Sequence, residues 1–239
     1  MPPRGIVIIP AFNEEAALPG VVADLRANAP DASILVVDDG STDNTAAVAR
    51  SLGVPVLPLP FNLGVGGALR TGFRYAVRNG FDRAVQFDGD GQHDATQIAI
   101  LMRALDDGAD LVIGTRFGEG TDYDVGRTRS GAMRLLRIGV RLLSGQAFTD
   151  TSSGFRAFSG RMLGYFAETY PREYLADTVE ALLLASYEGY RLAEVPVLMR
   201  QRTAGTASNR SFKLAYNYIR LFVVMVTTMP LRRRPRVAS

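Results

Sequence analysis

Short apolar runs rich in β-branched residues alternate with segments of helical periodicity along the first half of the chain. The runs occupy residues 5–11, 33–39, 54–60, 83–90 and 109–116, and they read GIVIIPA, SILVVDD, VPVLPLP, RAVQFDGD and ADLVIGTR. The helical patterns occupy residues 14–29, 41–53, 65–80 and 95–108. Apolar strands that alternate with helices are typical of a mostly parallel sheet covered by helices on both faces. The alternation therefore predicts an α/β domain of the nucleotide-binding type.

Length and composition agree with one such domain, or with one domain and a small appendage. The chain has 239 residues, of which 47% are hydrophobic, so it can bury a sizeable core and is not a disordered chain. The formal net charge is only +3, so the charge of the whole molecule does not indicate a nucleic-acid partner. Without cysteine there is no disulfide framework, no thiolate zinc site and no thiol nucleophile.

Acidic side chains stand where the predicted strands end, and in a parallel sheet ligands bind at these carboxyl ends. The acids are Asp38, Asp39, Asp88 and Asp90. Carboxylates bind phosphate poorly, but they bind a divalent cation that in turn binds phosphate. Asp88 and Asp90 can reach one ion if Gly89 lets the backbone turn, and Gln92 offers a further oxygen. The pattern predicts a Mg2+ or Mn2+ ion that carries a diphosphate.

The same residues also fit an ordinary turn, because Asp-Gly pairs are common turn formers and Asp94 suits the N-cap of a helix that begins near Ala95. His93 is the only histidine of the chain, so we expect it in a structural role or behind the metal ligands. The stretch GVGGALRTG at 64–72 has neither the G-x-G-x-x-G fingerprint nor a P-loop lysine, which favours close backbone packing.

Several motifs, in their order along the chain, closely resemble glycosyltransferase family 2 with the GT-A fold, and within it the dolichyl- and polyprenyl-phosphate sugar synthases. The motifs are PAFNEE, VVDDGSTDNT, NLGVGGALRTG, FDGDGQHD, DLVIGTRF, DTSSGFRAF, and EVPV followed by RTAG. The resemblance spans about residues 5–210. It implies a glycosyltransferase domain over residues 1–210, with an acceptor-side amphipathic segment at about 126–145.

The resemblance also implies roles for individual residues in binding the nucleotide. Phe12 and Glu14 match a loop in which an aromatic side chain lies near the base and an acid lies near the base or ribose. Asp39 matches a residue that contacts the base. The implied nucleotide-binding set is Pro10, Ala11, Phe12, Glu14, Asp39, Gly67, Asp88 and Gly89.

A second implied set carries the chemistry. Asp88, Asp90 and Gln92 match the family's metal and diphosphate site. Arg202 resembles the late arginine of an R-x-x-G-x-S segment that closes over phosphate, although the stretched spacing of RTAGTASNR leaves Arg200 and Arg210 as alternatives. The implied catalytic set is Asp88, Asp90, Arg127, Arg129 and Arg202.

The segment at 126–145 reads as a helix with one basic face, formed by Arg134, Arg137 and Arg141, and one apolar face. A solvated helix face is the simpler interpretation. Arg127 and Arg129 stand just before it, and a basic amphipathic helix at this place also suits a membrane surface with a phosphate to hold.

These observations predict an inverting, metal-dependent hexosyltransferase that moves a sugar from GDP-mannose, a UDP-hexose or a UDP-N-acetylhexosamine to a polyprenyl phosphate. One alternative is a hydroxyl-directed relative in cell-wall or polysaccharide assembly, with Asp177 or Glu180 as the general base. Another is a non-catalytic nucleotide-sugar-binding subunit, against which the intact acids argue. The hydroxyl-directed members of the family that the chain resembles usually have a basic and aromatic product-side motif. This chain has neither that motif nor a tryptophan, so the resemblance favours the lipid acceptor.

The C-terminal part, residues 211–239, is expected to be an amphipathic and basic tail. Its apolar stretch at 221–231 is far shorter than the roughly 20 residues that span a bilayer. No signal peptide is apparent, so we expect a cytoplasmic protein that is peripheral at the inner face of the cell membrane. A core helix with a solvated basic end, a small membrane-protein partner or a second copy of this chain are the alternatives.

Overall fold

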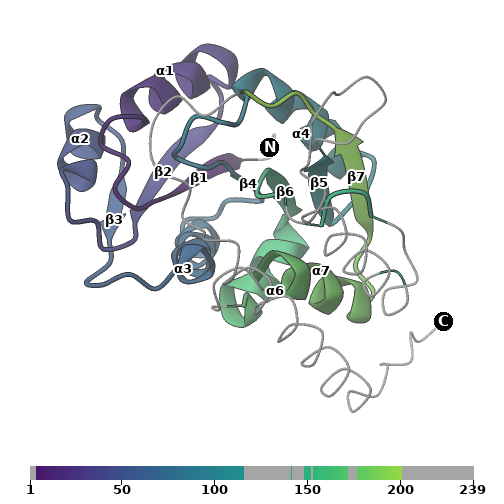
Figure 1. Cartoon of the computed structure of the whole chain (residues 1–239). Coiled ribbons are helices and arrows are strands. Elements are labelled where there is room, and N and C mark those ends of the chain that lie inside the picture. Colours follow the sequence, from purple (N-terminus) through teal and green to yellow (C-terminus); the bar gives the residue numbers. More distant parts are fainter. Residues whose placement is uncertain (1–3, 116–140, 142–147, 152, 172–176, 201–239) are drawn as a thin grey trace, which may run out of the picture.

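The computed structural model describes residues 4–115, 141, 148–151, 153–171 and 177–200, and Figure 1 shows their arrangement. Its sheet has the strand order β3-β2-β1-β4-β6-β5-β7. The strands are β1 Gly5–Ala11, β2 Ser33–Asp38, β3 Val56–Pro58, β4 Arg83–Gln86, β5 Leu111–Thr115, β6 Arg156–Ser159 and β7 Leu192–Pro196. The helices are α1 Leu18–Asn28, α2 Thr45–Ser51, α3 Val65–Arg78, the 3-10 helix η1 Ala95–Gln97, α4 Ile98–Asp106, α6 Gly160–Thr169 and α7 Asp177–Tyr187.

The five predicted strands are confirmed as β1 to β5. Strand β6 lies between β4 and β5 and is antiparallel to both, and β7 extends the sheet parallel to β5. The sequence pattern predicted neither β6 nor β7. Both are short, with four and five residues. The sheet is therefore mostly parallel, with one antiparallel strand inserted beside β4, the strand that precedes the acid pair.

Helix α1 begins four residues later than its pattern suggested. Pro19 lies in its first turn, the place where a missing backbone N–H costs least. The residues before it form a turn in which the Glu14 carbonyl accepts the N–H groups of Ala17 and Leu18. Glu14 therefore belongs to the loop after β1 and not to the helix.

Two apolar layers cover the sheet because successive strand side chains point to opposite faces. Ile6 and Ile8 pack with α3, α6 and α7, whereas Val7 and Ile9 pack with α1, α2 and α4. Figure 1 shows the two groups of helices on opposite sides of the sheet. The core thus holds the central strands rigidly and leaves their carboxyl ends to the loops.

The glycine stretch at 64–72 packs closely, as its pattern predicted. A Cβ atom on Gly72 would lie 2.5 Å from Cγ2 of Ile8, and one on Gly67 would lie 2.5 Å from Cβ of Leu63. Both glycines are buried in α3. Their role in packing is confirmed, since a side chain at either position would displace a neighbour.

Candidate active site

The loops after β1, β2 and β4 lie at one edge of the sheet. Ala11, the last residue of β1, pairs with Asp38, and its carbonyl accepts the Asp39 N–H at 2.8 Å. On the other side of β1, the Phe87 N–H donates to the Ile8 carbonyl at 3.0 Å, directly before the acid pair. The predicted nucleotide and metal residues of these loops are therefore neighbours in space.

The loops after β1 and β2 are joined by hydrogen bonds. Asn13 adopts a left-handed conformation with φ 57°, its Oδ1 accepts the Thr42 N–H at 2.8 Å, and its own N–H donates to the Ser41 hydroxyl at 2.9 Å. The Glu14 N–H donates to the hydroxyl of Thr45 at 2.9 Å. These bonds hold Phe12, which is 44% exposed, at the rim of the edge. Pro10 and Ala11 are buried as the last residues of β1.

Asp39 is buried, with 3% of its surface exposed, and its Oδ1 accepts the Leu63 N–H at 2.7 Å. Burial raises the pKa of Asp39 above the ordinary aspartate value, although the backbone N–H groups of Leu63 and Gly64 partly oppose the rise. Gly40, with φ +70°, allows the close approach of the two loops, because a Cβ there would lie 2.6 Å from the Phe61 carbonyl carbon. Asp39 thus ties the loop after β2 to the start of α3.

The acid pair follows β4 in a tight loop. Asp90 is buried, and its Oδ1 accepts the Gln92 N–H at 3.0 Å, whereas Asp88 is partly exposed. Gly154 lies against Asp88: a Cβ on it would be 2.8 Å from Oδ2 of Asp88. A side chain there would displace the Asp88 carboxylate, so the DTSSGFRAF segment approaches this acid through its backbone.

His93 supports this loop from behind. It is 3% exposed, its Nδ1 accepts the Asp88 N–H at 3.0 Å, and its ring stacks on Phe155 at a centroid distance of 4.8 Å. Because Nδ1 accepts, the ring proton lies on Nε2, which is 3.5 Å from Oδ2 of Asp88. The structural role expected for His93 is confirmed, and Asp94 is confirmed as the N-cap of η1.

The donor atoms fit a hard divalent cation. Asp88 and Asp90 offer carboxylate oxygens, and Oε1 of Gln86 is buried next to them without a hydrogen-bond partner among the described residues. In the described part of the chain, no group of three or more His, Cys, Asp or Glu side chains is arranged to hold a metal ion. An ion held by the acid pair would therefore complete its coordination with phosphate oxygens and water, as Mg2+ commonly does.

Arg156 is a residue whose importance the sequence did not show. It is fully buried, and its guanidinium donates to the carbonyls of Ser153 at 2.8 Å, Thr178 at 2.9 Å and Thr151 at 3.2 Å. It therefore holds the DTSSG loop against α7. Nothing in the local sequence pattern distinguishes Arg156 from a surface arginine. Its position in the DTSSGFRAF motif was the one sequence feature that could have indicated its importance.

Several predicted residues lie outside the described part of the chain. These are Arg116, Arg127, Arg129, Arg134, Arg137, Arg202, Arg210 and the tail at 211–239. Arg141 is described, and it is helical and exposed. Glu180, one of the alternative bases, lies in α7 and is partly buried. The boundary between a domain and a tail at residue 210 also falls outside the described residues.

The model of the Glycosyl transferase family 2 matches residues 6–168 of this chain. The chain belongs to glycosyltransferase family 2. Similar proteins include the polyprenol monophosphomannose synthase of Mycolicibacterium smegmatis, which is 31% identical over 217 residues, with 85% of this chain and 80% of that protein covered. The undecaprenyl-phosphate mannosyltransferase of Micrococcus luteus is 31% identical over 240 residues, with 97% and 96% covered.

A third family 2 relative is the UDP-N-acetylglucosamine–dolichyl-phosphate N-acetylglucosaminyltransferase of Methanococcus voltae, 32% identical over 238 residues, with 90% of this chain and 94% of that protein covered. Among solved structures, glucosyl-3-phosphoglycerate synthase from Mycobacterium tuberculosis in complex with Mn2+, UDP and phosphoglyceric acid has a TM-score of 0.71 at 22% identity, with 94% and 78% covered. This likeness confirms the GT-A fold of the family 2 chain.

None of the helices in the described part of the chain is both long and apolar enough to cross a bilayer.

Proposed function

We propose that this family 2 glycosyltransferase moves a sugar from a nucleoside diphosphate sugar to a polyprenyl phosphate, with Mg2+ or Mn2+ at the acid pair. The observation that carries the proposal is the placement of Asp88 and Asp90 at the end of β4, next to the loops that carry Asp39 and Phe12. The acceptor class is supported by the relatives: two are named as transferases with dolichyl phosphate or undecaprenyl phosphate, and a third is named as a polyprenol monophosphomannose synthase.

In this proposal, separate residues of the chain bind the nucleoside and the metal ion. Phe12 and Asp39 flank the nucleoside, and the Leu63 N–H keeps Asp39 in place. Asp88 and Asp90 hold the ion, and His93 orients the backbone at Asp88. The bound cation would stabilise the negative charge that develops on the leaving diphosphate. Neither aspartate is required to attack the sugar.

The acceptor needs no general base under this proposal. A phosphomonoester has a second pKa of about 6, so a polyprenyl phosphate is already a nucleophile at neutral pH. Arginines must then hold it, and Arg127, Arg129 and Arg202 are the proposed residues. A single displacement at the anomeric carbon inverts its configuration.

The site of action is proposed to be the cytoplasmic membrane surface, where a polyprenyl phosphate presents its head group. The basic tail at 211–239 and the segment at 126–145 would bring the enzyme to this surface. None of the relatives reported above is named with a small membrane-protein partner, so this partner receives no support from them.

The test is transfer of labelled sugar into extractable lipid. The purified full chain is incubated with undecaprenyl phosphate or dolichyl phosphate, Mn2+ or Mg2+, and in turn GDP-mannose, UDP-glucose, UDP-galactose and UDP-N-acetylglucosamine. We expect one donor to label the lipid, and EDTA to abolish the labelling. In a parallel reaction with a soluble oligosaccharide as acceptor, labelling of that saccharide with none in lipid would instead support the hydroxyl-directed alternative.

A further inference from the structure

The chain just after β7 is attached to the loop that carries the acid pair. The Arg200 N–H donates to the Gln92 carbonyl at 2.8 Å, and Met199 pairs with His93 in an antiparallel bridge. His93 in turn accepts the N–H of Asp88. The backbone of residues 199 and 200 therefore supports the loop of residues 88–93 directly.

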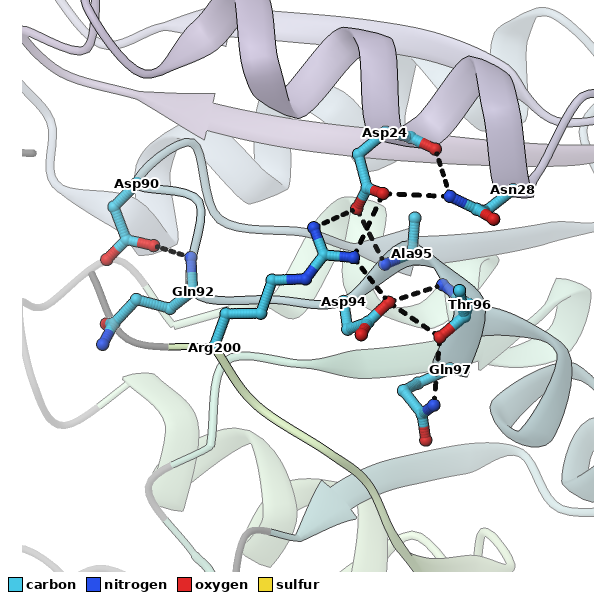
Figure 2. A network of polar contacts seen from close by, with 9 residues as sticks. All are labelled: Asp24, Asn28, Asp90, Gln92, Asp94, Ala95, Thr96, Gln97 and Arg200. Atoms are coloured by element: carbon cyan, nitrogen blue, oxygen red, sulfur yellow. Dashed lines mark hydrogen bonds and ion pairs between the residues drawn. The ribbon is translucent and has the colours of Figure 1, made fainter. Parts of the chain in front are cut away.

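The side chain of Arg200 continues this attachment on the other side of the loop. Its Nη1 lies 3.0 Å from Oδ2 of Asp24, and its Nη2 lies 2.9 Å from Oδ1 of Asp94 and 3.2 Å from Oδ1 of Asp24. Figure 2 shows the guanidinium extending toward these two acids, whereas the side chains of Asp90 and Gln92 lie away from it. Both terminal nitrogens of Arg200 are thus occupied by carboxylates.

The two carboxylates are themselves built into the structure. Asp24, on α1, accepts the Ala95 N–H at 3.1 Å, and Asp94 caps η1 by accepting the Thr96 N–H at 3.0 Å. Their side chains are only 15% and 17% exposed, so their charges are not well screened by water. The single positive charge of Arg200 is shared between the two carboxylates, and the guanidinium joins α1 to the end of the acid loop.

The pKa values agree with this geometry. Hydrogen bonding to Asp24 raises the pKa of Arg200 above its ordinary value. Burial opposes ionisation of Asp94, but hydrogen bonds from Thr96 and the Arg200 guanidinium outweigh it, so the pKa of Asp94 lies below its ordinary value. Removal of Arg200 would leave the carboxyl groups of Asp24 and Asp94, both mostly buried, without the cation that they share.

We propose that Arg200 is a positioning residue for the loop that carries Asp88, Asp90 and Gln92, and that it acts through Asp24, Asp94 and the Gln92 carbonyl without touching the donor. This inference rests on the proposed function for its effect on nucleotide binding. It also separates Arg200 from Arg202 and Arg210, the other two candidates for the phosphate contact.

The test is a double-mutant cycle on nucleotide binding. Calorimetry measures the binding of UDP and of GDP, each with Mn2+, to the wild-type chain, Arg200→Gln, Asp24→Asn and the double variant. We expect Arg200→Gln to weaken nucleotide binding about tenfold, or ~1.4 kcal/mol. The double variant should bind no more weakly than Arg200→Gln alone, because Asp24→Asn removes one of the two carboxylates that would repel each other without Arg200. Direct contact with the donor predicts additive effects instead, and additivity overturns the proposal.

Conservative and matched variants separate positioning from a general loss of stability. Arg200→Lys can satisfy one carboxylate but not both, so we expect it to restore only part of the binding. Arg74→Gln is the matched control, since Arg74 also makes a 3.0 Å ion pair and its side chain is 43% exposed, against 44% for Arg200. Arg74→Gln should bind nucleotide as the wild type does.

Hydrogen exchange provides a readout that needs no nucleotide. In Arg200→Gln, the amides of residues 88–97 should exchange faster than in the wild type, while those of α3 and α6 stay unchanged. Failure of the wild-type chain to bind either nucleotide would count against the proposed function, and the exchange data would then decide the inference alone. Unchanged exchange over 88–97 overturns it.

Discussion

At the scale of single residues, Asp90 differs from Asp88 in its surroundings. Asp90 is 7% exposed and accepts the Gln92 N–H, whereas Asp88 is partly exposed and lies beside His93. The ion proposed here would bind both carboxylates, so the two acids should matter for activity more than for folding.

We predict that Asp90→Asn lowers the rate of sugar transfer by at least about 100-fold. The variant would hold the cation less well, and the negative charge on the leaving diphosphate would lose the stabilisation that the cation supplies. The rate is measured with labelled donor and polyprenyl phosphate over a titration of Mn2+. Asp106→Asn is the control, since Asp106 pairs with Arg83 at 2.5 Å and its side chain is 57% exposed. Wild-type turnover by Asp90→Asn, or by the wild type in EDTA, would refute the metal role of the pair.

Asp39 carries a second prediction that concerns pH. Its pKa is raised in the folded state, chiefly by burial, so the folded chain holds the proton at pH values where the unfolded chain has released it. The free energy of unfolding therefore falls as pH rises from the unfolded pKa to the folded pKa, and the loss persists at neutral pH. Asp39→Asn, which still accepts the Leu63 N–H, should raise the Tm at pH 7 and change it little below pH 3.8.

The same position should affect donor binding. If Asp39 contacts the base, its loss removes an interaction present equally in the ground and transition states, so Asp39→Ala should raise the KM for the donor and leave kcat nearly unchanged. Steady-state kinetics over a range of donor concentrations separates the two constants. A large fall in kcat at constant KM would move Asp39 into the catalytic group.

At the scale of elements, helix α3 depends on close contact with the sheet. Gly72 faces Ile8 at a distance that leaves no room for a Cβ, whereas Gly164 in α6 has no neighbouring atom within 4 Å of its Cβ position. Both glycines lie inside helices. They therefore form a matched pair in which helix propensity is the same and packing differs.

We predict that Gly72→Ala destabilises the protein by about 1–2 kcal/mol, because overpacking against β1 outweighs the gain in helix propensity. Gly164→Ala should stabilise it by about 0.5–1 kcal/mol, since only the propensity term remains. Urea unfolding followed by circular dichroism measures both. A Gly72→Ala variant as stable as Gly164→Ala would show that α3 can shift away from Ile8 at little cost.

At the scale of the whole molecule, basic residues are concentrated in the tail, where Arg232, Arg233, Arg234 and Arg236 follow an apolar stretch. Near an anionic membrane each such residue contributes about 1 kcal/mol, and the attraction weakens with salt. Surface attachment would bring the chain to the polyprenyl phosphate proposed above as its acceptor.

We predict that a chain ending at Ser211 loses binding to anionic vesicles. Replacing Arg232, Arg233, Arg234 and Arg236 by glutamine should remove the salt-sensitive part of the binding and keep the apolar part. Co-sedimentation with vesicles of anionic and of neutral lipid, at low and high salt, measures both effects. Equal vesicle binding and equal transfer rates for the full and shortened chains would transfer the membrane role to the segment at 126–145.

The sequence by itself determined the strands β1 to β5, the close packing of the glycine stretch, the position of the acid pair and the structural role of His93. These features depend on local periodicity, on turn chemistry and on the rule that the carboxyl ends of parallel strands lie at one edge of the sheet. Residues close together in the sequence are therefore enough to predict them. The family also followed from motifs that are each short and local.

Only the tertiary structure decided the insertion of β6, the burial of Arg156 and the partners of Arg200. Arg200 bonds Asp24 and Asp94 across 176 and 106 residues of sequence, and nothing near any of the three indicates the other two. Likewise, β6 lies between β4 and β5 and is antiparallel to both, and its four residues indicate neither this place nor this direction. Long-range hydrogen bonds and strand order depend on how the whole chain packs, and local propensity does not encode that packing.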